Sequence, residues 1–362
     1  MSFSPTQPNN ELPPISNHGL KNEDFFDLLI KAQKELSELK GYTFKLPNPE
    51  LLLSPSVIRE SVESSSIENI NTTIVDVLKN QLIPEAERSP ADKEAIRYKS
   101  AVDWGFQKLG EVNISTRLIK GIMHKLLSDS DGEYRTKQNH IVNSSTGEIL
   151  YTPPIINKIP ELINEWENFA NNTAKDSLHP LIRIALAHYQ FEAIHPFDDG
   201  NGRTGRIIMV MQLLKEEILS LPVLYISSYI NKNKSEYYKL LQACNESQSY
   251  KPFVEFVLKG FCSQAIETKK TLFAIMDSFY EIKNRIRADH SKIYSADLVD
   301  SLFVSPVISP SRLATDLKIH RATASKYLQS LESTGILDSM KYKTYRFYFN
   351  KELLEILKGN KK

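Results

Sequence analysis

The stretch HPFDDGNGRTGRIIMVMQLLKEE, residues 195–217, combines a glycine-rich turn with an apolar helix. Gly200 and Gly202 carry no Cβ, so the backbone of the GNGR turn can approach a ligand closely. The helix is expected to begin near Arg203, which directs its first free N–H groups at the turn and creates an anion site. Arg203 and Arg206 lie on one face of the first turn, and two cations at the positive end of a helix are unfavourable without an anion. The stretch therefore predicts a polyphosphate site.

The same stretch supplies other groups that phosphate chemistry needs. Asp199 adjoins the turn and can hold Mg²⁺, a hard cation that bridges phosphate oxygens. His195 has the only side chain here with an unperturbed pKa near neutrality, so it can take a proton from an attacking hydroxyl. We expect Phe197 to turn inward and the side chain of Asn201 to hydrogen-bond a phosphate oxygen. A lone Gly-Asn-Gly is weak evidence, but the combination of specified positions favours a true motif.

The composition limits the class of protein. With 362 residues, 41% of them hydrophobic, the chain can bury a sizeable core and is expected to form two or three units. Its 45 basic residues nearly balance 44 acidic ones, which excludes a global attraction to nucleic acid or a membrane. No apolar run approaches the roughly 20 residues needed to cross a bilayer. Cys244 and Cys262 lack metal-ligand spacing, so we expect a soluble, reduced, cytoplasmic protein without membrane contact.

Helical periodicity covers most of the chain and predicts a mainly α fold. Residues 22–41 and 54–81 are two helical candidates in the N-terminal part, the second weakened by a serine cluster. One stretch departs from this pattern: QNHIVNSSTGEILYTPP, residues 138–154, has two short strand-like runs around a turn and predicts a β-hairpin. Its position favours a surface excursion, and the alternative is a flap whose free backbone edge receives a ligand or an added peptide strand.

The C-terminal part has a different pattern. Two helices are expected at residues 310–317 and 321–334, followed by an aromatic two-stranded ribbon. This order is typical of a winged helix-turn-helix domain. The side chains placed to face a DNA groove are Arg321, Thr323 and Lys326, and the ribbon adds Lys341, Lys343 and Arg346. Because residues 291–362 carry 12 basic and 7 acidic residues, a net of only +5, DNA binding and protein contact or dimerisation are left equally open.

HPFDDGNGRTGR, residues 195–206, matches the signature H-x-F-x-[DE]-G-N-G-R-x-x-R of the Fic family at every defined position. The hairpin resembles the target-binding flap of that family, and NKSEYYKLLQACN, residues 233–245, resembles its nucleotide-pocket helix. The resemblance covers roughly residues 20–262. It implies a helical core with a hairpin flap, ATP and Mg²⁺, and an enzyme that transfers AMP from ATP to a hydroxyl side chain of a target protein. Hydroxyls of the chain itself are further expected acceptors.

The resemblance implies a role for each matched residue. His195 is the general base that activates the target hydroxyl, and Asp199 holds Mg²⁺. The turn at residues 200–203 surrounds the α- and β-phosphates, and Arg206 binds the γ-phosphate. The implied ATP-binding residues, with Tyr238 and Asn245 nearest the nucleoside, are Glu68, Gly200, Asn201, Gly202, Arg203, Thr204, Gly205, Arg206, Tyr238 and Asn245. The implied flap residues, which depart from the family's more usual Val-aromatic-Ile-Gly run, are Asn139, His140, Ile141 and Val142.

SSSIEN, residues 64–69, resembles the family's inhibitory motif [ST]-x-x-x-E-[GN]. Taken alone, the stretch is typical of a solvated polar face. Ser64 and Glu68 are four residues apart on one face of a helix, and the resemblance implies that Glu68 reaches Arg206 and takes the place of the γ-phosphate. A buried arginine–carboxylate pair is strong and bidentate, so ATP would bind poorly or misaligned. In some members this glutamate positions water for removal of AMP, so a reverse activity stays open.

Other functions compete with AMP transfer. Phosphotransfer occurs in a branch of the family that tends to lack the full Gly-Asn-Gly-Arg-x-x-Arg set, whereas this chain keeps both arginines. A further hypothesis, which makes the protein a regulator and not an enzyme, is a DNA-binding protein whose core only senses nucleotide. The oligomeric state is also open, with a homodimer among the choices.

Five serial segments are expected. They are an extended N-terminal arm at 1–20, a helical region carrying the inhibitory helix at 21–105, the catalytic core at 106–262, a connecting helix at 263–290 and the winged helix-turn-helix domain at 291–362. The arm is rich in Pro and Asn and has neither the basic region nor the apolar core of a secretory signal.

Overall fold

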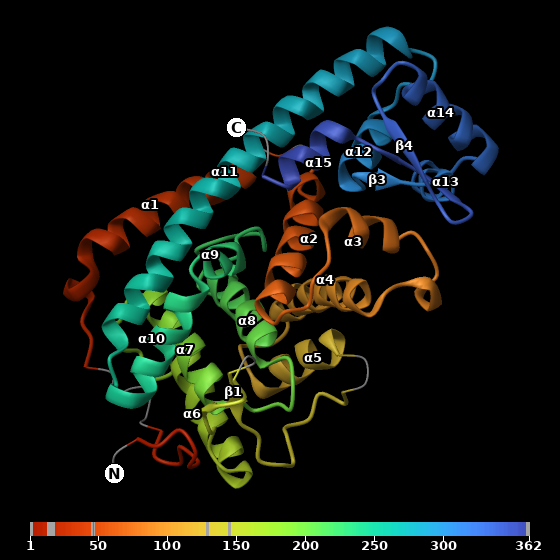
Figure 1. Cartoon of the computed structure of the whole chain (residues 1–362). Coiled ribbons are helices and arrows are strands. Elements are labelled where there is room, and N and C mark those ends of the chain that lie inside the picture. Colours follow the sequence, from red (N-terminus) through yellow and green to blue (C-terminus); the bar gives the residue numbers. More distant parts are fainter. Residues whose placement is uncertain are drawn as a thin grey trace. The chain divides into compact units, whose positions relative to one another are not determined.

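The structure of the protein, a computed structural model, describes residues 3–12, 19–44, 46, 48–127, 130–143 and 146–359. It is mainly helical with small antiparallel sheets (Figure 1), which confirms the predicted fold class. Among the residues described, no helix is both long and apolar enough to cross a membrane. The chain forms two compact units, which draw on more than one of the expected serial segments: Met1–Lys40 with Arg97–Ala265, and Gly41–Ile96 with Ile266–Lys362.

The central helix of the first unit is α7 (Pro180–Ile194), which packs against both α6 (Ile159–Ala170) and α8 (Asn201–Lys215) (Figure 1). Apolar residues lie on all sides of it, and nearly all of its residues are buried, the polar Arg183, His188 and Gln190 included. The unit also contains α5 (Thr116–Leu126), α9 (Ser227–Lys232), α10 (Lys234–Ser247) and two 3-10 turns at Asn22–Phe25 and Ile156–Lys158. Three helices run past its limits: α1 (Phe26–Thr43), α4 (Pro90–Leu109) and α11 (Tyr250–Asp289).

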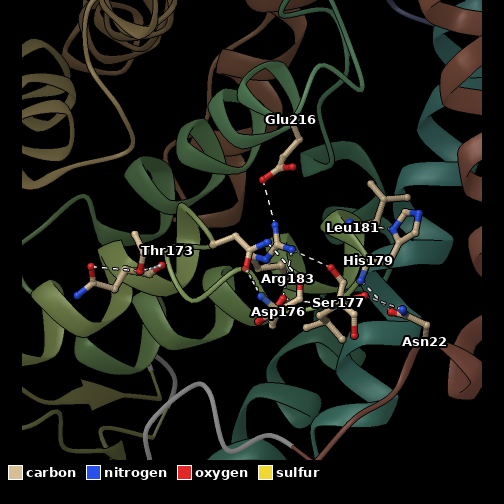
Figure 2. Close-up of polar contacts among 11 residues, drawn as sticks. Asn22, Thr173, Asp176, Ser177, His179, Leu181, Arg183 and Glu216 are labelled. Carbon is tan, nitrogen blue, oxygen red and sulfur yellow. Dashed lines mark hydrogen bonds and ion pairs between the residues drawn. The ribbon is translucent and has the colours of Figure 1, made fainter.

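Polar side chains fix the start of α7 (Figure 2). Pro180 is the first helical residue, and Nδ1 of His179 accepts the backbone N–H of Leu181 at 3.2 Å. Burial, and then the charge of Arg183, lowers the pKa of His179, which keeps the ring neutral and able to accept. Asn22 binds the same corner, because its Oδ1 accepts the backbone N–H of His179 at 2.8 Å. Helix α7, which ends just before His195, is therefore anchored by hydrogen bonds at its N-terminal end.

The predicted hairpin is present. Its strands β1 (Ile141–Val142) and β2 (Ile149–Tyr151) pair antiparallel, with Ile141 opposite Tyr151 and a register shift between Ile141 and Val142. Tyr151 is buried, and its hydroxyl donates to the carbonyl of Ala193 on α7 at 2.9 Å. One end of the hairpin is thus bonded to the last turn of α7.

The N-terminal arm lies along the segment that leaves the hairpin. The backbone N–H of Asn9 donates to the carbonyl of Thr152 at 3.0 Å, and the hydroxyl of Thr152 donates to the carbonyl of Pro5 at 2.7 Å. The ring of Phe3 stacks on that of Tyr151, with centroids 6.4 Å apart. The expected extended arm is therefore tied down over residues 3–12, and residues 13–18 of that expectation lie outside the described residues.

The second unit combines N-terminal helices with the C-terminal part of the chain. Its helices are α2 (Glu50–Ile67), α3 (Ile74–Asn80), α12 (Ala296–Val304), α13 (Pro310–Leu317), α14 (Arg321–Ser333) and α15 (Lys351–Leu357), with a 3-10 turn at Glu85–Glu87. Strands β3 (Val307–Ile308), β4 (Asp338–Tyr342) and β5 (Tyr345–Phe349) form an antiparallel sheet in the order β3-β5-β4. The two helices and the ribbon predicted from residue 310 onward are each present, although the second helix ends one residue earlier.

One hydrophobic core joins these distant segments of the second unit. Its buried residues are Ile58, Val77, Leu78, Ile83, Ala95, Val307, Phe347 and Leu354. Helices α2 and α3 therefore supply one side of the core, and β3, β5 and α15 supply another. The expected C-terminal segment, residues 291–362, does not pack by itself.

The helix expected over residues 54–81 is interrupted. Helix α2 ends at Ile67, Glu68 is its C-cap, and Asn69 adopts the left-handed conformation with φ 62°. Asparagine tolerates this conformation better than most residues do. A new helix, α3, starts after Thr73, whose side chain accepts the backbone N–H of Asp76 at 3.1 Å. Periodicity alone missed the break because the chain resumes an apolar helical pattern directly after it.

Candidate functional site

His195 is the residue at which α7 stops. Its backbone is left-handed, with φ 49° and ψ 59°, and its N–H closes the last turn on the carbonyl of Phe191 at 3.0 Å. The ring atom Nδ1 lies 3.3 Å from the carbonyl oxygen of Glu192. Because a carbonyl only accepts, Nδ1 carries the proton of the neutral ring, and the lone pair is on Nε2. Such a ring can accept a proton at Nε2.

Asn201 holds the loop that follows His195. Its Oδ1 accepts the backbone N–H of Phe197 and its Nδ2 donates to the carbonyl of the same residue, both at 2.9 Å. Phe197 is buried, as expected, and its ring lies 5.7 Å from that of Tyr134. Both ends of the Asn201 amide bind Phe197 and so shape the loop, and the expected contact with a phosphate oxygen stays a prediction.

Helix α8 begins at Asn201, two residues earlier than expected, with Gly200 as its N-cap. Gly200 has φ 78°, a left-handed conformation that favours glycine. A Cβ at this position would lie 3.2 Å from both Sδ and Cε of Met123. Because the first N–H groups of a helix have no acceptor within it, the turn and the first residues of α8 form the cradle of donors that the sequence predicts.

Asp199 and Arg203 are ion-paired at this cradle. Nη2 of Arg203 lies 3.0 Å from Oδ1 of Asp199, and the same oxygen accepts the backbone N–H of Gly200 at 2.6 Å. Arg203 is buried, whereas the side chain of Asp199 is 73% exposed. A carboxylate with one oxygen fixed and the group open to solvent fits Mg²⁺, which keeps several waters and needs few protein ligands beside phosphates.

Arg206 is buried one turn further along α8 and lies near a histidine that the sequence interpretation missed. That residue, His188 of α7, is fully buried, and burial followed by the charge of Arg206 lowers its pKa to about 3. Its Nε2 lies 2.8 Å from the hydroxyl of Tyr237 on α10. A signal for it was present, since His188 lies seven residues before His195 in an otherwise largely apolar stretch.

Two of the implied ATP-binding residues also pack closely against neighbouring helices. Thr204 is fully buried, and its Oγ1 lies 3.5 Å from Sδ of Met123 on α5. A Cβ at Gly205 would lie 2.5 Å from Oε1 of Glu192 and 3.3 Å from Nδ1 of His188. Glycine at position 205, for which the sequence offered no explanation, therefore lets α8 approach α7 closely.

Tyr238 and Asn245 share one face of α10, two turns apart. The ring of Tyr238 is 41% exposed and packs edge-on against Tyr237, with centroids 5.4 Å apart. Oδ1 of Asn245 accepts the hydroxyl of the buried Tyr189 at 3.0 Å. The amide of Asn245 is therefore held in place, while the ring of Tyr238 is partly open to solvent, and their place beside the nucleoside stays a prediction.

The hairpin adjoins the loop that follows His195. Nδ2 of Asn139 donates to the carbonyl of Phe197 at 3.3 Å, and Nδ1 of His140 lies 2.8 Å from the hydroxyl of Thr152 across the hairpin. Ile141 and Val142 form β1, and the side chain of Val142 is 49% exposed. The hairpin is therefore bonded to the loop that carries His195, which favours the flap over a simple surface excursion.

The predicted inhibitory residues belong to the other unit. Ser64 is fully buried within α2, and Glu68 caps that helix, so both lie in the second unit, whereas Arg206 lies in the first. The contact of Glu68 with Arg206 stays a prediction.

Two cations of the C-terminal ribbon are ion-paired within the second unit. Nζ of Lys343 lies 3.0 Å from Oε2 of Glu87, whose Oε1 accepts the hydroxyl of Tyr345 at 2.9 Å. Nη2 of Arg346 lies within 2.9 Å of both carboxylate oxygens of Glu332. These pairs neutralise two of the three basic side chains noted on the ribbon.

Two family models match adjacent parts of the chain. Residues 26–107 match "Fic/DOC family N-terminal", and residues 113–213 match "Fic/DOC family". The chain belongs to the Fic/DOC family. A third model, "Protein adenylyltransferase SoFic-like, C-terminal domain", matches residues 279–353.

Curated Fic relatives match part of the chain. "Protein adenylyltransferase Fic" of Drosophila grimshawi is 34% identical over 126 residues, which are 35% of this chain and 23% of that protein. The protein of the same name from Drosophila melanogaster is 30% identical over 151 residues, 41% of this chain and 28% of that protein. The chain thus spans about a quarter of the length of these relatives.

Solved Fic structures share the fold. A Fic family protein from Desulfovibrio desulfuricans aligns with a TM-score of 0.56 and 19% identity, over 95% of this chain and 98% of that chain. A Fic domain containing signaling protein from Bacteroides thetaiotaomicron gives a TM-score of 0.53 and 20% identity, over 70% of this chain and 96% of that chain. At such identities the likeness supports the fold alone.

Proposed function

We propose that this Fic chain transfers AMP from ATP to a serine, threonine or tyrosine hydroxyl of a protein, its own hydroxyls included, and that Glu68 restrains the reaction. The observation that carries the proposal is the contact of His195 Nδ1 with the carbonyl of Glu192, which leaves Nε2 available beside the start of α8 with its free N–H groups. The curated relatives are named protein adenylyltransferases, which agrees with this assignment.

The proposed reaction uses each of these groups. Nε2 of His195 takes the proton from the target hydroxyl while its oxygen forms a bond to the α-phosphorus of ATP. The bond from that phosphorus to the bridging oxygen breaks, and pyrophosphate leaves with the electron pair. The N–H groups of the first turn, with Arg203 and Arg206, stabilise the charge on the phosphates. Asp199 would hold Mg²⁺, which supplies further charge neutralisation to phosphate oxygens.

The brake would act on the same phosphates. A carboxylate of Glu68 paired with Arg206 would exclude the γ-phosphate, because a buried bidentate pair is strong. The same glutamate could direct water at a protein-bound AMP, so removal of AMP is part of the proposal for this site.

The competing functions have less support. Phosphotransfer is disfavoured because both Arg203 and Arg206 are present at the cradle. DNA regulation is disfavoured because Lys343 and Arg346 are already ion-paired. We propose instead that the ribbon and α14, the winged helix-turn-helix expected from the sequence, contact a protein. A reducing, cytoplasmic setting agrees with the free thiols of Cys244 and Cys262, and burial raises the pKa of Cys244 to about 12.

The test compares two labels in one variant. Glu68→Gly, which removes the brake, is incubated with ATP labelled on the α- or the γ-phosphate, and intact mass is measured. We expect label from the α-phosphate only, a mass increase of one AMP, and loss of both in the double variant with His195→Ala. Labelling from the γ-phosphate, or full labelling without His195, would refute the proposal. Equal rates with and without Glu68 would refute only the brake.

A further inference from the structure

A buried arginine joins the flap to the catalytic loop. Arg135 precedes the hairpin and is 3% exposed. Its Nε donates to the carbonyl of His195 at 3.0 Å, its Nη1 to the carbonyl of Lys137 at 3.2 Å, and its Nη2 to the carbonyl of Pro154. Its backbone N–H donates to the carbonyl of Pro196 at 2.9 Å. One guanidinium therefore binds the segment that enters the hairpin, the segment that leaves it, and the backbone of His195.

The acceptors of Arg135 are neutral carbonyls. Burial lowers the pKa of this guanidinium, and the charge of Asp198 partly opposes that effect. Burying a cation is costly unless hydrogen bonds compensate. A planar group with five donors can satisfy three carbonyls at once, whereas the single nitrogen of lysine cannot keep that geometry.

The bond to His195 bears on an unfavourable backbone conformation. His195 has φ 49°, a left-handed conformation that is unfavourable for a residue other than glycine. Such a conformation persists only where the surroundings hold it. The carbonyl held by Arg135 belongs to this residue, and a cation is favourable at the C-terminal end of a helix such as α7.

We infer that Arg135 is a positioning residue: it holds the left-handed backbone of His195 and ties it to both ends of the flap, so that docking of a target on the flap and orientation of the base are coupled. The inference rests on the proposed AMP transfer. ATP binding does not depend on this link, because Asn201 and the Asp199–Arg203 pair hold the α8 cradle separately.

The test is Arg135→Lys in the Glu68→Gly background. We expect self-labelling from α-labelled ATP to fall about a hundredfold, the loss typical of a base misplaced by about 1 Å. The affinity for a fluorescent ATP analogue should change less than about twofold. The pH profile of labelling and the imidazole NMR signals of His195, assigned with His195→Ala, should both shift.

Arg183→Lys is the matched control. Arg183, a residue of α7, is also 3% exposed. It donates to the carbonyl of Leu178 and to the carboxylates of Asp176 and Glu216 (Figure 2). We expect this variant to lower the melting temperature without moving the pH profile or the His195 signals.

Several results would overturn the inference. They are labelling by Arg135→Lys within about twofold of its parent, a matching loss of labelling in Arg183→Lys, or unchanged His195 signals. If the parent variant does not label, the proposed function fails, and the His195 signals still decide the role of Arg135.

Discussion

The hydroxyl of Tyr237 on α10 lies 2.8 Å from Nε2 of His188 on α7, and both side chains are buried. Tyr237→Phe would remove the hydrogen-bond partner of this buried ring nitrogen, so we expect the free energy of unfolding to fall by about 1–3 kcal/mol. Urea denaturation followed by circular dichroism measures this. The neighbouring Tyr238→Phe, which alters a ring 41% exposed, should change stability by less than about 0.5 kcal/mol. Equal effects of the two variants would contradict the role given to this bond.

His188 should make the stability depend on pH. Its pKa is about 3 in the fold and near 6.5 in the unfolded chain, so below pH 6.5 the unfolded state binds more protons. Its contribution is therefore complete above about pH 6.5 and is lost as the pH falls toward 3, by up to about 1.4 kcal/mol per pH unit. We expect the stability difference between the wild type and His188→Gln to narrow as the pH is lowered from 7 to 4.5. A constant difference would show that His188 titrates normally.

Gly200→Ala should disturb the cradle. The left-handed φ of 78° costs alanine about 1–2 kcal/mol, and the new Cβ would press on Met123 at 3.2 Å. We expect lower stability and weaker binding of ATP, measured by calorimetry, because the first N–H groups of α8 would shift. Gly41→Ala is the control: it lies within α1 with nothing within 4 Å of its Cβ position, and alanine should stabilise a helix there. Unchanged ATP affinity in Gly200→Ala would contradict the cradle.

Asp199→Asn should raise the Mg²⁺ requirement. The amide keeps an oxygen for the N–H of Gly200 but loses the charge that a hard cation prefers. In the Glu68→Gly background we expect self-labelling at limiting Mg²⁺ to fall at least about tenfold and to recover partly at high Mg²⁺. Chelation with EDTA should abolish labelling in the parent. Asp198→Asn, the adjacent exposed carboxylate, should leave the Mg²⁺ dependence unchanged. Identical Mg²⁺ curves for the two variants would refute the assignment of Asp199.

Local features of the site could be predicted from the sequence. Gly200 can adopt its left-handed conformation because it has no Cβ, and the apolar run after it indicates a helix from local pattern alone. The hairpin at residues 141–151 was predictable for the same reason, since strands and turn are consecutive. The start of α8 was misplaced by two residues because the N-cap is Gly200, whereas a start at Arg203 would place the N-cap at Gly202.

Features that join distant residues could not be predicted. Arg135 meets carbonyls that lie 2, 19 and 60 residues away, and nothing in the letters around it indicates those acceptors. The two bonds of the Asn201 amide to Phe197 were not predicted, because they depend on how the loop folds back. Periodicity showed that α2 and α3 bury an apolar face, but not that β3 and β5 cover it.

The shared core of the second unit restricts how this chain can be shortened. Cutting before residue 291 would expose the apolar faces of Val77 and Leu78 to water, and the excised fragment would expose Phe347 and Leu354. Each product would therefore lose the apolar surface that covers its own part of the core. The C-terminal segment and the helix that carries Ser64 therefore depend on each other for folding, although they lie far apart in the sequence.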